Sequence, residues 1–567
     1  MGDGIGAEAR SAVVERPPAV EEAVAAGPEE DRGHGPARPG RLRLGRADLA
    51  VMGLLLVVAF GLRYFSPIMP DLFAGKLWPP VSDCVRSTPV DQRGDPGTLC
   101  GLAYPYQRSY AAAGQPASPP NGQVFDEIYF AVFAHDDLTG VAYFDPEPPL
   151  AKELIAAGEW LVGWWRATFQ GARGSYADLG FNTYGWRIMV CVFGSLCVPL
   201  MYLLAYLLWR NRWFALAAAT MVCFDGLFFV ESRIAVIDIF PIFFIMLAYV
   251  CFLVHLGSRG QKSALATLLL TGVVVGLGIS AKWIALAAWA SILLFLIVRP
   301  LMRHVGVTVG RGERAWSWGL GGPGLPGGAR PGPYAAVAVV SMVVLPALIY
   351  LASWFPFFLR GQFHDLHDLL VYNWQAYEYQ ATLTATHPYG SAWYTWPFLY
   401  RPVAYYYQYQ GLGIDGTTGR ALVAGIVNLG NPVIWWASIP AVLALPYFVL
   451  RHRSFPAAVL LVGYLTQYLP WSRVTRVLFL YHYFGALIFA ILALAFVLVR
   501  MQRAGPVRLD LFGSRHVIPT GWLVPAFLVL VVVAFAYFYP VWTALPISDQ
   551  AYLSGFPVGK MWLRTWI

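Results

Sequence analysis

The sequence predicts an all-α polytopic membrane protein that crosses the bilayer about eleven times. Hydrophobic residues make up 57% of the 567 residues and charged residues only 13%, whereas a typical soluble domain has roughly 25% charged residues. Apolar runs of about 20 residues, the length needed to span a bilayer, recur along the chain. Lys and Arg gather in alternate loops between these runs, as they do on the cytoplasmic side of membrane proteins.

The chain begins with residues 1–47, which are rich in Ala, Glu, Pro, Gly and Arg and are predicted to form a disordered tail. The first apolar run, "ADLAVMGLLLVVAFGLRYF", lacks a small-residue cleavage site and is therefore predicted as a membrane anchor, not as a removed signal peptide. Ten further spans are predicted near residues 185–209, 213–231, 234–256, 263–280, 281–299, 334–358, 431–450, 455–471, 477–499 and 521–540.

The basic loops predict the orientation. With eleven spans, they all lie in the cytoplasm if the N-terminus does, and residues 551–567 then form an extracytoplasmic C-terminal tail. Residues 300–333 contain "GLGGPGLPGGARPGP" and are predicted as a flexible cytoplasmic linker. The net charge of +8 is explained by this loop pattern, so nucleic-acid binding is not expected.

Two outer loops, 66–184 and 360–430, are long and hold most of the polar and aromatic material. Transporters usually place their chemistry at the bilayer midplane, so this distribution favours an enzyme that works at the outer membrane surface. In the first loop, Cys84 and Cys100 are predicted to form a disulfide if the loop faces an oxidising compartment.

The stretch "VFDEIYF" places Asp126 and Glu127 side by side among aromatic residues. Adjacent side chains diverge, so one carboxylate is expected to face a reacting group while the other anchors the loop to a cation. Apolar surroundings raise a carboxyl pKa, which suits a general base. The alternative is that Asp126 only caps a helix that begins near Glu127.

A second acidic stretch, 145–149, reads Asp-Pro-Glu-Pro-Pro and leads into a helix predicted to begin at Leu150. Lys152 lies in the first turn of that helix, where the helix dipole does not favour a cation. It is therefore expected to meet a phosphate or a carboxylate; the alternative is a lysine that extends to the membrane interface.

Charged residues also interrupt the apolar runs, where they are costly and usually functional. These residues are Arg187, Asp225, Arg233, Asp238 and Lys282. Arg233 and Asp238 are five residues apart and are candidates for a pair. Structural ion pairs are the alternative for each, but together with the loop charges they suggest a charged cavity that opens outward.

No convincing metal cluster appears in the sequence, and no metal or cofactor is predicted. His364 and His367, beside Asp365 and Asp368, have a spacing that suits a metal site on a helix face. A solvated polar loop is the favoured interpretation of these four residues.

The ordered motifs over residues 48–550 resemble those of the protein O-mannosyltransferases, membrane enzymes of glycosyltransferase family 39 that use a polyprenyl-phosphate mannose donor. The motifs are "FDEIYFA", "FDPEPPLAKELIAAGEWL", "YGWRIMVCVFGSLCVPLMY", "CFDGLFFVESRIAVIDIF", "GISAKW", "HPYGSAWYTWPFLYRPVAYYY", "LGNPVIWW", "VGYLTQYLPW", "FLYHYFGALIF" and "FYPVWTALPIS". Loop 360–430 is too short for the β-trefoil domain that eukaryotic members carry, so the chain resembles a bacterial member.

This resemblance implies a GT-C fold in the cell membrane, with the active site outside. It implies that Asp126 is the catalytic base, with Glu127 as its partner, and that Arg187, Lys282 and, less directly, Lys152 bind the donor phosphate. Further residues match the family pattern without an assigned role: His387, Trp393, Trp396, Arg401, Tyr481 and His482. Glu147 departs from the family, which usually has His before Pro-Pro-Leu.

The resemblance implies transfer of mannose, with inversion, to Ser or Thr hydroxyls of secreted or membrane proteins, in contact with membrane lipid and in association with the secretion machinery. The donor already carries a good leaving group, so the reaction needs a base and phosphate-binding cations but no general acid. The first alternative is a GT-C enzyme that transfers a sugar to a lipid or glycan, and the second is a transporter or flippase.

Overall fold

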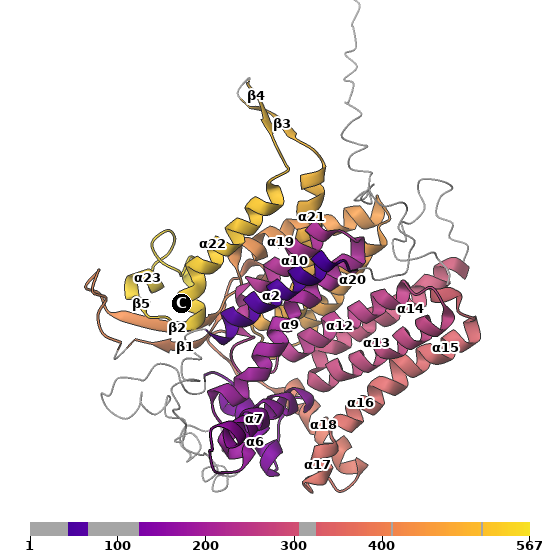
Figure 1. Cartoon of the computed structure of the whole chain (residues 1–567), viewed down its shortest axis with the longest axis vertical. Helices are drawn as coiled ribbons and strands as arrows, with labels where there is room; N and C mark the ends of the chain where they lie inside the picture. Colours follow the sequence, from indigo (N-terminus) through magenta and orange to yellow (C-terminus); the bar gives the residue numbers. More distant parts are fainter. Residues whose placement is uncertain (1–43, 66–123, 305–324, 410–411, 512–513, 567) are drawn as a thin grey trace, which may run out of the picture.

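The computed structural model describes residues 44–65, 124–304, 325–409, 412–511 and 514–566 (Figure 1). The predicted tail, up to residue 43, and the predicted Cys84–Cys100 disulfide lie outside these residues. The prediction of an all-α membrane protein is confirmed, because eight helices of the described part are long and apolar enough to cross a membrane. They are Arg46–Tyr64 (α2), Thr183–Trp209 (α9), Ile239–Leu256 (α12), Gln261–Ala281 (α13), Pro331–Leu359 (α15 to α17), Pro432–Leu450 (α19), Leu480–Arg503 (η7 and α21) and Leu523–Thr543 (α22).

The other three predicted spans fold as shorter or broken helices. They form Arg212–Cys223 (α10) with Gly226–Val230 (α11), Trp283–Ala285 (η2) with Leu286–His304 (α14), and Phe455–Tyr468 (α20) with Leu469–Arg473 (η6). The break between α10 and α11 has a local cause. Asp225 leaves the helical conformation and accepts a hydrogen bond from the amide of Phe228, so that it caps α11.

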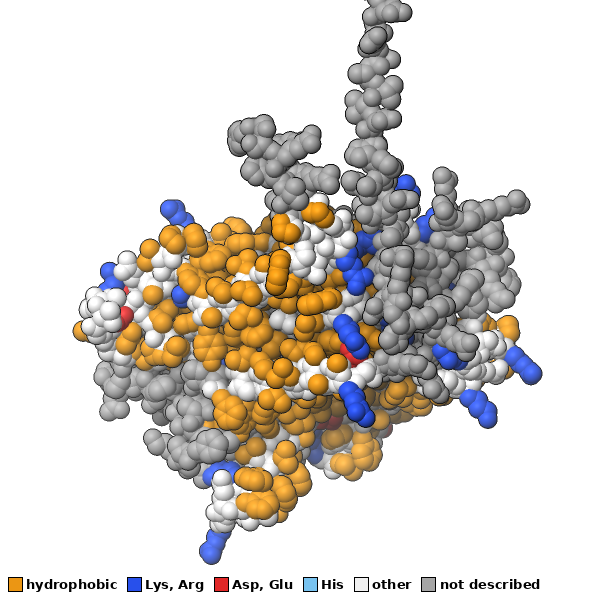
Figure 2. Space-filling view, turned by 45° about the horizontal axis from the view of Figure 1, so that its top comes forward, with side chains coloured by type: hydrophobic (Ala, Val, Ile, Leu, Met, Phe, Trp, Pro, Cys, Tyr) orange, Lys and Arg blue, Asp and Glu red, His pale blue; other side chains and the backbone are white. Residues whose placement is uncertain are grey.

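The long helices pack around α9, α12 and α21, whose side chains are mostly buried in one continuous apolar core. Helices at the periphery instead expose aliphatic side chains, such as Leu54 on α2, Leu443 on α19 and Val529 on α22. Figure 2 shows the result on one face of the molecule: hydrophobic side chains cover a broad area, with lysines and arginines at its margins. Such a surface is expected to face lipid.

Smaller elements form a layer at one end of the bundle (Figure 1). From the first long loop come Glu127–Thr139 (α6), Leu150–Phe169 (α7) and Tyr176–Gly180 (α8); from the central loop come Leu366–Thr382 (α18) and Trp393–Phe398 (η5). The first group docks closely on α9. A Cβ at Gly163 of α7 would lie 1.8 Å from the carbonyl oxygen of Tyr176, and one at Gly185 of α9 would lie 1.8 Å from that of Gly180.

The helix prediction missed two small antiparallel sheets. Val403–Gln408 (β1), Leu422–Asn428 (β2) and Ile547–Ser548 (β5) form a sheet in the order β1-β2-β5 within the layer just described. Val507–Leu511 (β3) and Ser514–Ile518 (β4) form a hairpin, which projects from the opposite end of the bundle in Figure 1.

Two further predicted segments contain regular structure. Part of the Gly-rich linker folds as Pro326–Gly328 (η3), and α14 and α15 extend into the linker from either side. The predicted C-terminal tail, residues 551–567, begins within Asp549–Leu553 (α23) and contains Arg564–Trp566 (η8). It packs on the central loop: the indole of Trp566 donates a hydrogen bond to the carbonyl of Leu399 at 2.5 Å.

Candidate active site

Asp126 lies at the tight turn that begins α6. It occupies the position before the first helical residue, but its side chain makes no capping hydrogen bond. Phe125 takes a positive φ of 52°, and its ring stacks on Tyr405 of β1 with the centroids 4.1 Å apart. The turn therefore holds a half-buried carboxylate that the helix does not use.

Glu127 has the opposite role in the local structure, because both of its oxygens are engaged and its side chain is fully buried. Arg187, the fifth residue of α9, donates from Nε at 2.7 Å and from Nη2 at 2.6 Å. The amides of Val124 and Ala235 complete the set at 2.8 and 2.6 Å. Glu127 thus fixes the loop that carries Asp126 to α9 and to residue 235.

This arrangement bears on the prediction that Arg187 binds the donor phosphate. Its guanidinium is fully buried and forms a two-point ion pair with Glu127. The geometry favours a positioning role for Arg187 over direct phosphate contact.

Lys152 stabilises the Asp-Pro-Glu-Pro-Pro turn. Its buried ammonium donates to a carboxylate oxygen of Asp145 and to the carbonyl oxygens of Glu147 and Pro148, the last two at 2.8 and 2.9 Å. An ammonium has three hydrogens to donate, and these three acceptors use all of them. The expected carboxylate contact is present, and the three acceptors leave no ammonium hydrogen for a phosphate in this arrangement, which favours a structural role for Lys152.

Lys282 joins two helix ends at the rim of the bundle. It ends α13 in an extended conformation, and its Nζ lies 2.9 Å from Oδ1 of Asp238, which precedes α12, and 3.7 Å from Oε1 of Glu147. The predicted Arg233–Asp238 pair is therefore wrong: Asp238 pairs with Lys282, while Nη1 of Arg233 donates to the carbonyl of Trp542 at 2.6 Å. Asp238 pairs with Lys282 because the N-terminal end of α12 adjoins the C-terminal end of α13.

The charges around Asp126 shift its protonation. Burial, together with the negative charges of Asp238 and Asp145, raises the pKa of Asp126 to about 7, although the Lys282 ammonium acts in the opposite direction. Burial also raises the pKa of Glu147, against the effect of Lys282. A carboxyl group with a pKa near neutrality is well suited to accept a proton at physiological pH.

The family-pattern residues of the central loop dock on the segment before α21. The ring of Trp396 stacks on His482 at 6.0 Å, the ring of His387 meets Phe479 edge-on at 5.2 Å, and the amide of Ser391 donates to the carbonyl of Leu478 at 2.8 Å. These contacts join two parts of the chain about 90 residues apart.

The other residues of this group are placed as follows. Trp393 packs edge-on against Tyr468, and Arg401 donates to the carbonyls of Pro388 and Thr565 at 3.2 and 2.8 Å. Both therefore brace the layer internally. Tyr481 lies within electrostatic range of Asp126 and Asp238 and thus at the candidate site itself.

Sequence reasoning missed Glu231, which lies in the quoted motif "ESRIAVIDIF". Its Oε1 accepts hydrogen bonds at 2.6 Å from the hydroxyl of Tyr405 and from the side-chain amide of Asn428. The carboxylate thereby ties the sheet to the segment after α11. Its position at the end of the predicted span 213–231, where a charged residue is costly, was the available signal.

Asp225 and the predicted His/Asp cluster lie outside the site. Asp225 is engaged by the amides of Phe228 and Asn431 and the indole of Trp435. The exposed group Asp365, His367 and Asp368 has ligand atoms within 4.8 Å of one another, but Asp365 accepts the amide of Asp368 as the cap of α18. Capping explains this cluster without a metal.

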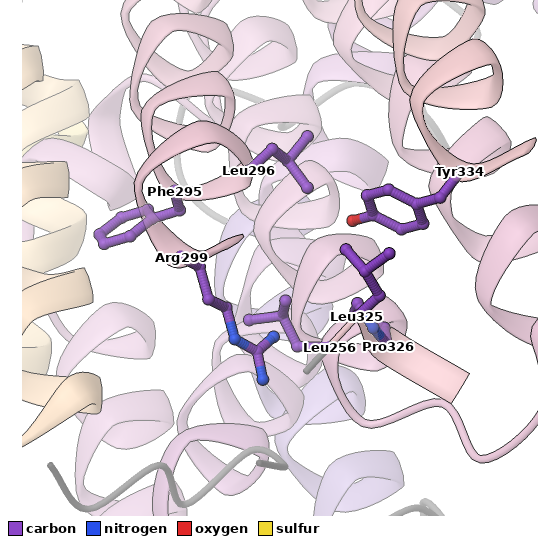
Figure 3. Close-up of a pocket in the computed structure, with 7 residues that line it drawn as sticks. All are labelled: Leu256, Phe295, Leu296, Arg299, Leu325, Pro326 and Tyr334. Carbon is purple, nitrogen blue, oxygen red and sulfur yellow. The ribbon is translucent and has the colours of Figure 1, made fainter. Parts of the chain in front are cut away.

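A pocket between α12, α14, η3 and α15 lies far from Asp126 (Figure 3). It is lined by Leu256 at the C-terminal end of α12, whereas Asp238 precedes the N-terminal end. The 18 residues of α12 separate the two by roughly 27 Å at 1.5 Å per residue. The pocket contains none of the predicted site residues; its lining is Leu256, Phe295, Leu296, Arg299, Leu325, Pro326 and Tyr334.

Comparisons with known proteins are consistent across the chain. Residues 115–359 match the family model of dolichyl-phosphate-mannose-protein mannosyltransferases, and residues 365–566 match that of the C-terminal four-helix membrane region of protein O-mannosyltransferases.

Two relatives and one solved structure cover most of the chain. A polyprenol-phosphate-mannose–protein mannosyltransferase of Mycolicibacterium smegmatis is 26% identical over 78% of this chain and 87% of its own length. The enzyme of the same name from Corynebacterium glutamicum is 26% identical over 78% of this chain and 88% of its own length. The Saccharomyces cerevisiae protein O-mannosyltransferase Pmt1-Pmt2 complex, solved with the sugar donor, superposes with a TM-score of 0.65 at 14% identity, covering 94% of this chain and 96% of that one. The predicted fold class is thereby confirmed.

Proposed function

The chain belongs to the dolichyl-phosphate-mannose–protein mannosyltransferase family, and from this membership we propose the following reaction and site. The protein is a membrane glycosyltransferase that transfers mannose from a polyprenyl-phosphate mannose donor to protein, as its bacterial relatives are named. Asp126 acts as the base. The observation that carries this assignment is a half-buried carboxylate with no capping hydrogen bond and a pKa of about 7.

In the proposed step, a Ser or Thr hydroxyl oxygen attacks the anomeric carbon of the donor from the face opposite the phosphate. The new C–O bond forms while the bond from carbon to phosphate oxygen breaks, and its electron pair leaves with the phosphate. Asp126 takes the hydroxyl proton. In-line displacement inverts the anomeric centre, and no general acid is needed because phosphate is a good leaving group.

The position of the charges supports transfer over transport. Asp238 lies immediately before α12 and Lys282 immediately after α13, so the charged groups gather at helix ends beside the outer-loop elements. A transporter usually binds its substrate near the bilayer midplane. No observation favours a lipid or glycan acceptor over a protein acceptor.

For the topology, we propose a cytoplasmic N-terminus, an extracytoplasmic C-terminus, and a site on the outer face of the cell membrane. The pattern of basic loops supports this orientation. Association with the secretion machinery follows if acceptor segments are modified as they emerge from the membrane.

The direct test uses purified membranes, radiolabelled polyprenyl-phosphate mannose and a Ser/Thr-rich peptide. Wild-type protein is expected to label the peptide, while Asp126→Asn is expected to label it far more slowly. Label that enters a lipid extract instead of the peptide would favour the alternative acceptor class. If Asp126→Asn labels the peptide as fast as wild type does, Asp126 is not the base.

A further inference from the structure

The proposed reaction leaves one requirement open, namely the cation that receives the departing phosphate. The bond that breaks converts a phosphodiester into a phosphomonoester, so negative charge accumulates on the phosphate during the step. A cation that contacts this phosphate stabilises the transition state more than the bound donor, which is the condition for catalysis.

The cations expected from the sequence are already engaged within the protein. Lys152 donates to three oxygens of its own turn, and Arg187 forms the buried two-point pair with Glu127. Lys282 is accessible only in part and lies between the carboxylates of Asp238 and Glu147. The charge of Lys282 is therefore largely balanced before any donor binds.

Arg476 differs from these three residues. It lies between η6 and η7, in the segment that leads to Tyr481, and its side chain is only partly buried. The one hydrogen bond that joins its guanidinium to a described residue is a long contact of 3.5 Å from Nη1 to the carbonyl of the adjacent Val477. No carboxylate within the described residues forms an ion pair with it.

The backbone around Arg476 is nevertheless held firmly at the site. Leu478, two residues later, accepts the amide of Ser391, and the ring of Phe479 lies between His387 and Tyr481 at 5.2 and 5.4 Å. Arg476 is within electrostatic range of Lys282, and both Arg476 and Asp126 act on Tyr481. A guanidinium for which the described residues supply no carboxylate partner is thus held near Lys282 and Tyr481.

We propose that Arg476 is the residue that binds the phosphate of the polyprenyl donor and of the polyprenyl phosphate product. A guanidinium offers two parallel N–H groups that match two phosphate oxygens, and such charge-assisted bonds are the strong ones. In this proposal Lys282 attracts the phosphate by its charge, without a direct hydrogen bond. The catalytic part of this inference rests on the proposed function, whereas the binding of polyprenyl phosphate by Arg476 can be measured without it.

The test measures binding and turnover separately in purified wild type, Arg476→Gln and Arg476→Lys. Binding is measured with polyprenyl phosphate, with inorganic phosphate as the comparison anion, by the ligand-induced rise in Tm. Arg476→Gln is expected to lower affinity for polyprenyl phosphate and kcat/KM for the donor by about 10- to 100-fold. Arg476→Lys is expected to recover part of both, because it keeps the charge but loses the fork.

Arg473→Gln is the matched control. Arg473 lies in the same segment, carries the same charge and is exposed, so its replacement is expected to change neither quantity more than about twofold. Unchanged binding in Arg476→Gln, or an equal loss in Arg473→Gln, would overturn the assignment.

The two readouts keep this inference distinct from the proposed function. Binding of polyprenyl phosphate requires no acceptor, so a wild-type protein that failed to mannosylate peptide would contradict the function alone. An unliganded Tm close to that of wild type shows that Arg476→Gln folds. Should that variant not fold, Arg476→Lys decides, since full wild-type affinity and turnover with Lys would contradict a two-point contact.

Discussion

The carboxylate of Glu127 and the guanidinium of Arg187 meet in a fully buried two-point contact, with Nε and Nη2 of the arginine 2.7 and 2.6 Å from the two oxygens. The contact joins the residue next to Asp126 to the N-terminal part of α9. A buried pair of this kind is a weak source of stability when complete, but it is costly to break by removing one partner. The pair is therefore best understood as a device that places Asp126.

Removal of one partner is expected to be severe. We expect Glu127→Gln and Arg187→Gln each to destabilise the protein by about 3–5 kcal/mol, because each leaves a buried polar or charged group without its partner. The double variant is expected to be much less destabilised than the sum. Thermal unfolding in detergent, with turnover measured alongside, provides the double-mutant cycle; strict additivity would show that the two side chains act independently.

The rate of transfer is expected to depend on the ionisation of Asp126. A base works only when deprotonated, so turnover should rise tenfold per pH unit below about pH 7, the pKa of Asp126, and level off above it. Asp126→Asn is expected to lower turnover by about 10²- to 10⁴-fold. A profile that stays flat from pH 5 to 8, with an active Asn variant, would contradict this role.

Lys282 is expected to tune that profile. Its positive charge lowers the pKa of Asp126, so Lys282→Met should move the acid limb of the pH profile to higher pH. A variant that keeps the wild-type limb would show that the two groups are not coupled. The Arg473→Gln variant is a suitable control, since the same charge is removed from an exposed position.

Lys152 is expected to behave as a structural residue. Lys152→Met leaves the carboxylate of Asp145 and two carbonyl oxygens without their donor, and we expect a lower Tm together with a lower kcat. The KM for the donor should change by less than about threefold, because no phosphate contact is lost. A selective rise in that KM, at unchanged Tm, would restore the phosphate-binding role expected from the sequence.

Glu147 is expected to weaken donor binding. Its carboxylate lies 3.7 Å from Nζ of Lys282 and repels an anionic donor. Glu147→Gln removes the charge while keeping the size, and we expect the KM for the donor to fall several-fold. Glu147→His, which restores the residue usual in the family, should act in the same direction; an unchanged KM in both variants would show that the departure has no consequence for the donor.

The sequence was sufficient for the long helices and for the loop that carries the carboxylate pair, because both signals are local. A continuous apolar run identifies a span whatever its neighbours do, and "FDE" beside aromatic residues marks an unusual environment. The sheet was not foreseen for the opposite reason. β1 has the aromatic-rich sequence "VAYYYQ", and its pairing with β2 joins residues about 20 positions apart.

The partners of the charged residues were also beyond the sequence. Lys152, Arg187 and Lys282 are all cationic candidates for a phosphate, and only their contacts divide them into a turn residue, a member of a buried pair and a rim residue. Arg476 was overlooked because it precedes an apolar run and resembles an ordinary flanking arginine. The segment that carries it is placed by the docking of residues 387–396 onto residues 478–482.

The stack of Phe125 on Tyr405 has a consequence for engineering. The turn that presents Asp126 belongs to one outer loop, but the surface against which it rests belongs to another, almost 280 positions later in the chain. Grafting the first loop of a relative onto this scaffold would therefore give a misaligned base unless the strand with Tyr405 were exchanged too. In a chimeric enzyme, the two outer loops should therefore be exchanged together.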